Sequence, residues 1–182
     1  MTSDWEHLTR AKNGDEESFV IIFNKYNKML LRMTSLITGS IDSAKDIAQE
    51  SFIRLIKKRI KHQHGSFKTY LTTIAYRLAL KERYRINKNT SVNELSIMDK
   101  SISPLDKQIY KENQKNVFAT ISSLPEKQKE ILVLRFYGNH TYEEIAMISN
   151  LPLGTVKSRI YYAVKQCGKI LKDKGYLNES PK

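Results

Sequence analysis

The 182-residue chain has few cysteine, proline, glycine and tryptophan residues: it has one cysteine, four prolines, seven glycines and one tryptophan. A single cysteine excludes an internal disulfide framework. Cys167 is also far in sequence from His62 and His64, so these residues do not predict a metal site. No apolar run approaches the roughly 20 residues that span a bilayer, and no signal peptide opens the chain. We therefore expect a cytoplasmic protein with no membrane insertion.

Several motifs of catalysis are also missing. The sequence contains no glycine-rich phosphate loop, no Gly-x-Ser-x-Gly elbow and no Cys-x-x-Cys pair. These absences argue against the common phosphoryl-transfer, acyl-transfer and thiol-redox enzymes. We expect no enzymatic activity and no cofactor.

Acidic residues are scarce in one part of the chain. The sequence carries 31 Lys and Arg against 19 Asp and Glu, a net charge of +12. Residues 54–88 hold eleven Lys and Arg but one Glu, so this short segment carries +10 of that net charge. Such concentration indicates a polyanionic partner. A basic membrane-binding patch is the rival explanation, and the absence of apolar anchors disfavours it.

Apolar residues recur at helical spacing in three segments of the first half, and no segment alternates as a strand does. The stripes are Phe19, Ile22, Phe23, Tyr26, Leu30, Met33 and Ile37; Ala44, Ile47, Ala48, Ser51, Phe52 and Leu55; and Leu71, Ile74, Ala75, Leu78 and Ala79. We therefore predict an all-α fold in which these helices pack as a bundle.

A polar stretch divides the chain, and a second helical block begins near Leu105. We predict two small helical domains, residues 1–87 and 105–182, joined by a flexible linker at 88–104. We expect the two domains to fold independently and not to dock, because each charged surface is suited to a different partner.

Four consecutive apolar residues, Ile131 to Leu134, cover more than one face of a helix. This surface either binds a partner or is buried on all sides within its own small domain, and the sequence leaves both alternatives open.

Residues 141–159 have the layout of a helix-turn-helix. Thr141 and Glu144 form a capping box that starts a first helix, and Asn150 suits a left-handed helix end. A second helix follows Pro152. Its buried stripe is formed by Val156, Ile160, Ala163 and Cys167. The cysteine is therefore expected to be a core thiol.

The opposite face of the second helix carries hydroxyl and cationic groups, which are the groups that read base edges and bind phosphates. The candidate DNA contacts are Thr155, Lys157, Ser158, Arg159 and Tyr162. An ordinary amphipathic helix with a solvated basic face is the alternative for any single residue. The capping box, turn and basic helix together favour DNA binding.

These segments resemble a known family. Residues 42–55 resemble the region 2 helix by which sigma factors bind core RNA polymerase, and residues 67–75 resemble the promoter-melting segment that follows it. Residues 124–159 resemble region 4, including the run from Gly154 to Arg159. Two such regions and a short linker are the layout of an extracytoplasmic-function (ECF) sigma factor.

The resemblance implies three binding surfaces. The face that binds the polymerase clamp would carry Asp46, Gln49, Glu50 and Ile53. The minus-ten element of the promoter would meet Phe67, Tyr70, Thr73, Tyr76, Arg77, Lys81 and Arg83, of which Thr73, Tyr76, Arg77 and Lys81 are expected to point outward. The minus-thirty-five element would meet the second helix of the helix-turn-helix.

Three positions depart from the family pattern. Tyr70 replaces the usual Trp, Tyr76-Arg77 replaces Arg-Asn, and Lys81 replaces an Asp. Because the family Asn helps to hold a flipped base, we expect an unusual minus-ten specificity. We also expect a stacking mode of DNA opening that needs no ATP.

The function implied is promoter-specific initiation with core RNA polymerase, with promoter DNA and an anti-sigma factor as further partners. A stand-alone helix-turn-helix repressor or activator, or a helical protein-interaction module, is the alternative. The basic, aromatic-bearing third helix and the acidic face at Asp46 and Glu50 argue against the repressor or activator. For an interaction module the net charge of +12 would be incidental.

Overall fold

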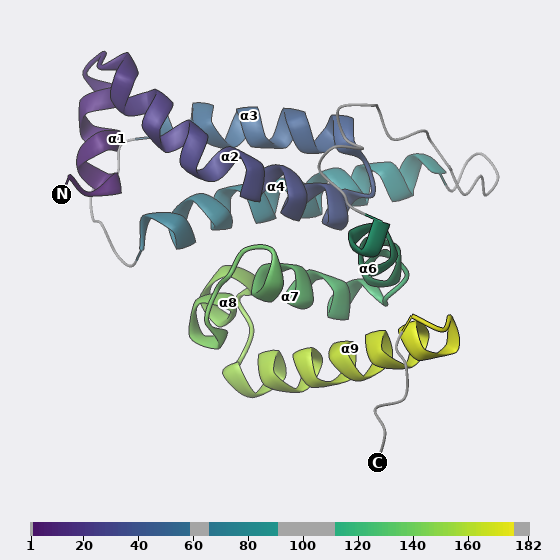
Figure 1. Ribbon diagram of the computed structural model, residues 1–182. Helices are drawn as coiled ribbons and strands as arrows, with labels where there is room; N and C mark the ends of the chain where they lie inside the picture. The colour runs from purple at the N-terminus through teal and green to yellow at the C-terminus, as the bar shows by residue number, and fades with distance from the viewer. Residues whose placement is uncertain (1, 59–65, 91–111, 177–182) are drawn as a thin grey trace.

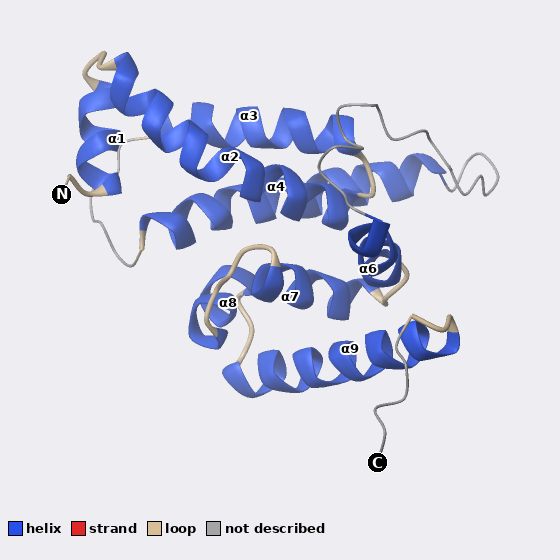
Figure 2. Ribbon diagram, viewed as in Figure 1, coloured by secondary structure: helices blue, strands red, loops and turns tan. Residues whose placement is uncertain are grey.

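The computed structural model describes residues 2–58, 66–90 and 112–176, and these residues form helices without any strand (Figures 1 and 2). The prediction of an all-α fold is therefore confirmed. In chain order the helices are α1 (Asp4–Lys12), α2 (Glu16–Thr38), α3 (Ile41–Lys57), α4 (Phe67–Thr90), α6 (Glu112–Ser122), α7 (Glu126–Phe136), α8 (Tyr142–Ser149) and α9 (Leu153–Asp173).

Local sequence signals set several helix ends. The N–H of Glu144 donates to the Thr141 hydroxyl, and the Thr141 N–H donates to the Glu144 carboxylate, so the predicted capping box is present. Asn150 ends α8 with a φ of 54°. Gly39 ends α2 in the same left-handed region, with a φ of 73°, which costs a glycine nothing sterically.

The first four helices form one layer, drawn in the upper part of Figure 1. Helix α2 lies at its centre and contacts α1, α3 and α4. Leu30 and Met33 of α2 are fully buried there. At one end of the layer the ring of Phe67 packs 5.2 Å from Trp5 and 5.3 Å from Tyr26, between ring centroids.

The last four helices form a second layer beneath the first (Figure 1), in which α9 contacts α6, α7 and α8. The middle of α7 is enclosed: Ile131, Leu132, Val133 and Leu134 are each at most 3% exposed. The apolar run is buried by the chain itself, but not within its own small domain as the second alternative stated. Its cover comes from α9 below and α2 above.

The two layers are docked, contrary to the expectation that the two domains do not dock. Helix α2 contacts α6 and α7, and α4 contacts α8. The buried side chains of both layers form one continuous hydrophobic core. The physical reason is that α7 has too much apolar surface for its own layer to cover. Helix α4 runs to Thr90, so residues 88–90 of the predicted linker are helical, and residues 91–104 lie outside the described ranges.

We predict that alanine substitutions at two glycines change the free energy of unfolding in opposite directions. Gly39→Ala should lower the free energy of unfolding by about 1–2 kcal/mol, because an L side chain is strained at positive φ. Gly168→Ala should raise it by up to ~1 kcal/mol, because Gly168 lies inside α9 with open space around the added methyl group. Urea unfolding of both variants measures the difference. Equal effects would contradict the assigned helix end.

Candidate nucleic-acid and polymerase interface

Helix α3 presents the predicted polymerase-binding residues to solvent. Asp46, Gln49 and Ile53 are exposed and Glu50 is half-buried, while Ala44, Ala48 and Leu55 point into the core. The Glu50 carboxylate pairs with Arg54 at 2.6 Å along the same helix face. The structure thus brings all four predicted residues onto one surface, as helical spacing requires.

An apolar groove with a volume of about 630 Å³ extends this surface onto α2. Gln49 and Ile53 line it together with Phe19, Phe23 and Ile56. Phe19 and Phe23 were predicted to be part of the core stripe, whereas the structure places them at the edge of the core, where they line the groove. The sequence signal for this position was that Phe19 and Phe23 are four residues apart and lie next to fully buried positions. We call this region, comprising the α3 face and the groove, the clamp surface.

The predicted minus-ten residues lie on two different sides of helix α4. Arg77 and Lys81 are exposed and Thr73 is half-buried on one side. Tyr84, which the sequence analysis did not single out, is 73% exposed beside them. An aromatic ring among cations is the arrangement that binds single-stranded nucleic acid. We call Thr73, Arg77, Lys81 and Tyr84 the open side of α4.

Three other predicted residues are covered, and the expectation that Tyr76 points outward is wrong. Tyr76 is 4% exposed because α7 lies over it, and Phe67 is 3% exposed because it packs in the aromatic cluster. Tyr70 is half-buried, 5.7 Å from Trp5, with Lys58 Nζ 5.9 Å from its ring. Phe67 serves the core in this arrangement, whereas a minus-ten contact needs an exposed ring.

One carboxylate of α7 binds the covered side of α4. The Tyr76 hydroxyl donates to Glu130 Oε2 at 2.8 Å, and the guanidinium of Arg83 lies 2.6 Å from Glu130 Oε1. Arg83 also approaches Glu126 at 3.4 Å. Burial, followed by the charge of Glu130, raises the pKa of Tyr76, so the phenol stays protonated and donates. Arg83 is therefore an ion-pair partner here and not a free cation.

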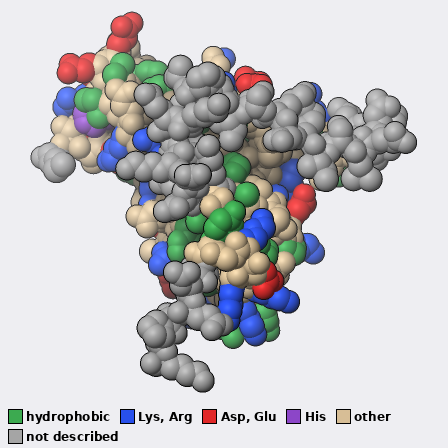
Figure 3. All heavy atoms as spheres, turned by 45° about the vertical axis from the view of Figure 1, so that its right-hand side comes forward, with side chains coloured by type: hydrophobic (Ala, Val, Ile, Leu, Met, Phe, Trp, Pro, Cys, Tyr) green, Lys and Arg blue, Asp and Glu red, His purple; other side chains and the backbone are tan. Residues whose placement is uncertain are grey.

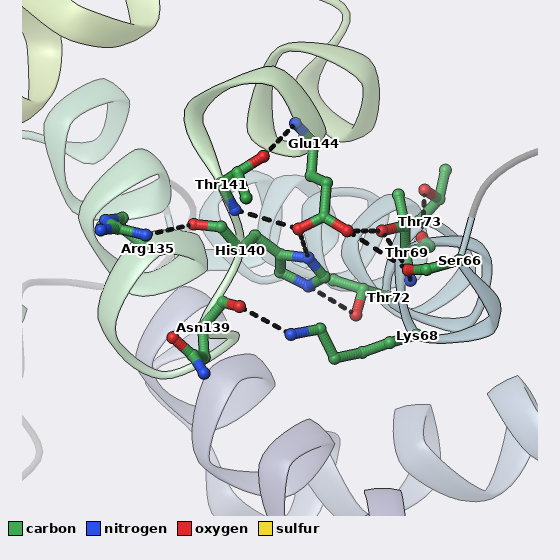
Figure 4. A network of polar contacts seen from close by, with 10 residues as sticks. All are labelled: Ser66, Lys68, Thr69, Thr72, Thr73, Arg135, Asn139, His140, Thr141 and Glu144. Carbon is green, nitrogen blue, oxygen red and sulfur yellow. Dashed lines mark hydrogen bonds and ion pairs between the residues drawn. The ribbon is translucent and has the colours of Figure 1, made fainter.

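A second polar cluster joins α4 to the start of α8 (Figure 4). Thr69 donates to Glu144 Oε1 at 2.6 Å, and Lys68 donates to the Asn139 carbonyl at 2.6 Å. The His140 ring bridges Thr72 at 3.0 Å and Glu144 at 3.2 Å. Glu144 therefore closes the capping box of α8 and binds α4 with the same carboxylate. Sequence patterns indicated the first role and gave no signal for the second.

The environment of this cluster shifts two pKa values. Burial and the positive charge of Lys68 lower the pKa of His140 to about 4, although Glu144 opposes the shift. Burial acts to raise the pKa of Glu144, but hydrogen bonds from Thr69 and the Thr141 backbone lower it to about 2. At neutral pH the cluster contains a neutral imidazole and an ionised carboxylate.

The predicted minus-thirty-five residues lie along the first turns of α9. Lys157, Ser158 and Tyr162 are exposed, whereas Thr155 and Arg159 are half-buried. Tyr161, 62% exposed, packs edge-to-face on Tyr162 with 5.4 Å between ring centroids. Figure 3 shows Lys and Arg side chains gathered with hydrophobic ones, Tyr included, at the lower end of the visible face, where α9 lies.

A second groove, of about 880 Å³, lies where the two layers meet. Its floor is apolar and includes Met29, Ile121, Leu132 and Cys167. Lys28 and Arg32 of α2 line it as well. We call it the seam groove. Cys167 is half-buried in this floor, and burial raises the pKa of its thiol. His62 and His64 lie outside the described residues.

Two family models match the chain. The model described as Sigma-70 region 2 matches residues 22–89, and the model described as Sigma-70, region 4 matches residues 114–167. These segments contain α3, α4 and the helix-turn-helix. Among the described residues, no helix combines the length and the apolarity that a membrane crossing needs.

Characterised relatives match over most of their length. The chain is 32% identical to the ECF RNA polymerase sigma-E factor of Salmonella typhimurium over 168 residues, covering 86% of the chain and 87% of the relative. It is 27% identical to the ECF RNA polymerase sigma factor SigW of Bacillus subtilis, covering 92% and 96%.

Two solved structures are similar in fold. One is the sigma factor RpoE in complex with the anti-sigma factor NepR from Bartonella quintana, with a TM-score of 0.72, 21% identity, and 86% and 98% coverage of the two chains. The other is CnrH in complex with the cytosolic domain of CnrY, with a TM-score of 0.65, 16% identity, and 94% and 99% coverage.

We predict that acid destabilises the chain through His140. Its pKa is about 4 when folded and 6.5 in the unfolded chain, so the unfolded chain binds more protons between these values. Stability should be full above pH 6.5 and fall by on the order of 3 kcal/mol as the pH drops to 4. Glu144 should extend the loss from about pH 4.5 towards 2.

Urea unfolding between pH 7.5 and 4.5 measures this loss. His140→Gln should flatten the curve in that range, because the variant has no imidazole to protonate. Parallel losses in the wild-type chain and His140→Gln would assign the effect to other groups.

Proposed function

The chain belongs to the ECF sigma factors of RNA polymerase, and from this premise we propose which of its surfaces meet polymerase and which meet DNA. As a member of this family it binds core RNA polymerase and directs promoter-specific initiation of transcription. We assign residues 1–87 to the region 2 domain, 88–104 to the linker and 105–182 to the region 4 domain, although α4 itself reaches Thr90.

The clamp surface is the proposed site for core polymerase. Asp46 and Glu50 offer carboxylates to a basic partner, while Ile53 and the groove beside it offer apolar area. A mixture of apolar centre and charged rim is typical of protein interfaces. This combination on one exposed helix face is the observation that carries the assignment.

Helix α4 is the proposed minus-ten reader. Arg77 and Lys81 would bind the phosphates of the non-template strand, and an aromatic ring would stack on an unpaired base. Tyr84 joins the proposed set because it is exposed beside these cations. Tyr76 and Arg83 belong to this set once α7 no longer covers them. Tyr70 could join this set only if its ring were released from its packing.

Helix α9 is the proposed minus-thirty-five reader. Lys157, Ser158 and Tyr162 point to solvent at the start of a helix, where a major groove admits side chains to base edges. Arg159 and Thr155 stand at the edge of this surface and are suited to phosphates. Tyr161 extends it by one exposed ring.

We propose that catalysis of RNA synthesis belongs entirely to the polymerase and that the chain supplies promoter recognition and melting. We propose a cytoplasmic location, because core RNA polymerase and promoter DNA are found there. An anti-sigma factor is a further proposed partner, because one of the similar structures is a sigma factor in complex with an anti-sigma factor. The seam groove suits an amphipathic helix with acidic residues, since its floor is apolar and Lys28 and Arg32 line it.

Reconstituted transcription tests the function. Purified chain plus core polymerase should give discrete run-off transcripts from a promoter of its own genome, and core polymerase alone should not. A stand-alone repressor or activator would instead bind duplex DNA specifically without polymerase. Absence of both transcripts and core binding would contradict the proposal.

We predict that Asp46→Lys with Glu50→Lys weakens core binding about tenfold or more, because both carboxylates lie on the clamp surface. The fold should survive, since exposed pairs such as Glu50–Arg54 contribute at most ~1 kcal/mol. Fluorescence anisotropy with labelled chain measures the affinity. The matched control is Glu17→Lys with Asp173→Lys, which makes the same charge change at two exposed positions elsewhere. Equal affinities of the two double variants would contradict the assigned surface.

A further inference from the structure

Helix α1 contacts the start of α4, although it lies before the residues that the Sigma-70 region 2 model matches. The ring of Trp5 packs edge-on against Phe67, with 5.2 Å between ring centroids, and tilted against Tyr70, at 5.7 Å. Trp5 is the only tryptophan of the chain. Because Phe67 and Tyr70 are three residues apart on a helix, this one side chain of α1 spans the first turn of α4.

Helix α1 is fixed in place by contacts other than those of Trp5. The Asp4 carboxylate accepts hydrogen bonds from Lys25 Nζ and from the Tyr26 hydroxyl, each at 2.6 Å. At the other end of the helix, Lys12 Nζ donates to the Lys58 carbonyl at 2.6 Å. These contacts tie α1 to α2 and to the end of α3. Trp5 therefore has a defined position from which it can order a neighbouring side chain.

Tyr70 depends on ring packing because its hydroxyl makes no hydrogen bond. The hydroxyl oxygen is buried without a partner. The hydroxyls of Tyr26 and Tyr76, by contrast, donate to carboxylates. An unsatisfied buried hydroxyl disfavours the position that it occupies. Packing against Trp5, and no hydrogen bond of its own, therefore holds the Tyr70 ring.

Two neighbours of the Tyr70 ring differ in how firmly they are held. The Lys58 ammonium lies 5.9 Å from the ring centroid, and its long, exposed side chain can move away at little cost. Trp5 is half-buried on an anchored helix and stays. Departure of Lys58 would release ring area for an unpaired base while Trp5 still orders the ring. An ordered ring binds a base more tightly than a rotating one, because its conformational entropy is already lost.

We propose that Trp5 is a positioning residue for promoter melting, which holds the Tyr70 ring where an unpaired base of the minus-ten element stacks on it. This inference rests on the proposed role of α4 in minus-ten recognition, and it adds α1 to the parts of the chain that open DNA. Stacking has to offset the cost of unpairing, so a preordered ring shifts the balance from closed to open promoter. A promoter that is already unpaired at the minus-ten element does not need this contribution.

Run-off transcription from two templates tests the inference. One is a duplex promoter of the chain's own genome, and the other has the same sequence with mismatches that unpair the minus-ten element. At saturating holoenzyme, Trp5→Ala should lower the output about tenfold on the duplex, through loss of the aromatic contact, and less than about twofold on the mismatched template. Trp5→Phe keeps a ring against Tyr70 and should restore most of the duplex output.

A double-mutant cycle tests whether Trp5 acts through Tyr70. In a Tyr70→Ala background, Trp5→Ala should lower the duplex output by less than about a further twofold, because the ring that Trp5 orders is absent. Fluorescence anisotropy should find the affinity for core polymerase unchanged in both single variants, since neither residue lies on the clamp surface.

The matched control for a loss of stability alone is Leu36→Ala, which removes a fully buried side chain from the same layer. Leu36 lies about 15 Å beyond Tyr26 along α2, so the substitution leaves the aromatic cluster in place. It should change the outputs from the two templates by the same factor. If circular dichroism finds Trp5→Ala unfolded, Trp5→Leu replaces it, because leucine fills part of the volume but has no ring.

Equal losses of Trp5→Ala on the two templates would overturn the inference, as would an unchanged duplex output or a full additional loss in the Tyr70→Ala background. In each case wild-type transcription from both templates would leave the proposed function intact. Absence of wild-type transcripts from both templates, together with absence of core binding, would overturn the proposed function and this inference with it.

Discussion

The enclosure of α7 is the constraint on which the rest of the structure depends. Its four consecutive apolar residues need cover on every side, and α6, α8 and α9 of its own layer supply only part of that cover. The remaining apolar area is removed from water by α2, at roughly 25 cal/mol per Å² buried. Once α7 lies against the first layer, its one buried carboxylate, Glu130, must find donors there, since an unpaired buried charge is costly. Tyr76 and Arg83 are those donors.

The helices and their ends were predictable because they depend on neighbours in sequence. The capping box of Thr141 and Glu144, the left-handed Asn150 and the stripe of Val156 and Ile160 are all confirmed. The exposed faces of α3 and α9 followed from the same periodicity. Each of these features is set by residues at most four positions apart.

The docking was not predictable in the same way, because it depends on contacts between residues more than 50 positions apart, such as Tyr76 with Glu130. Helical spacing placed Tyr76 on the solvent side of its own layer, and it could not identify the second layer that covers this residue. The only sequence signal of the docking was the run from Ile131 to Leu134. This run has an excess of apolar surface, but it does not identify the residues that cover that surface. The role of Glu144 towards Thr69 was hidden for a related reason, since its capping function already accounted for its position.

The seam groove exists only because residues of α2 and residues of α6, α7 and α9 lie on opposite walls of the same hollow. A molecule that binds both walls has no such site when the layers separate. By thermodynamic linkage it must therefore favour the closed arrangement by the same factor by which closure favours its binding. An occupant of the groove and a partner that binds only the separated layers need not share any contact residue to exclude each other. Their competition would be exerted through the distance between the two layers, and its strength would rise with the occupant's concentration relative to its dissociation constant.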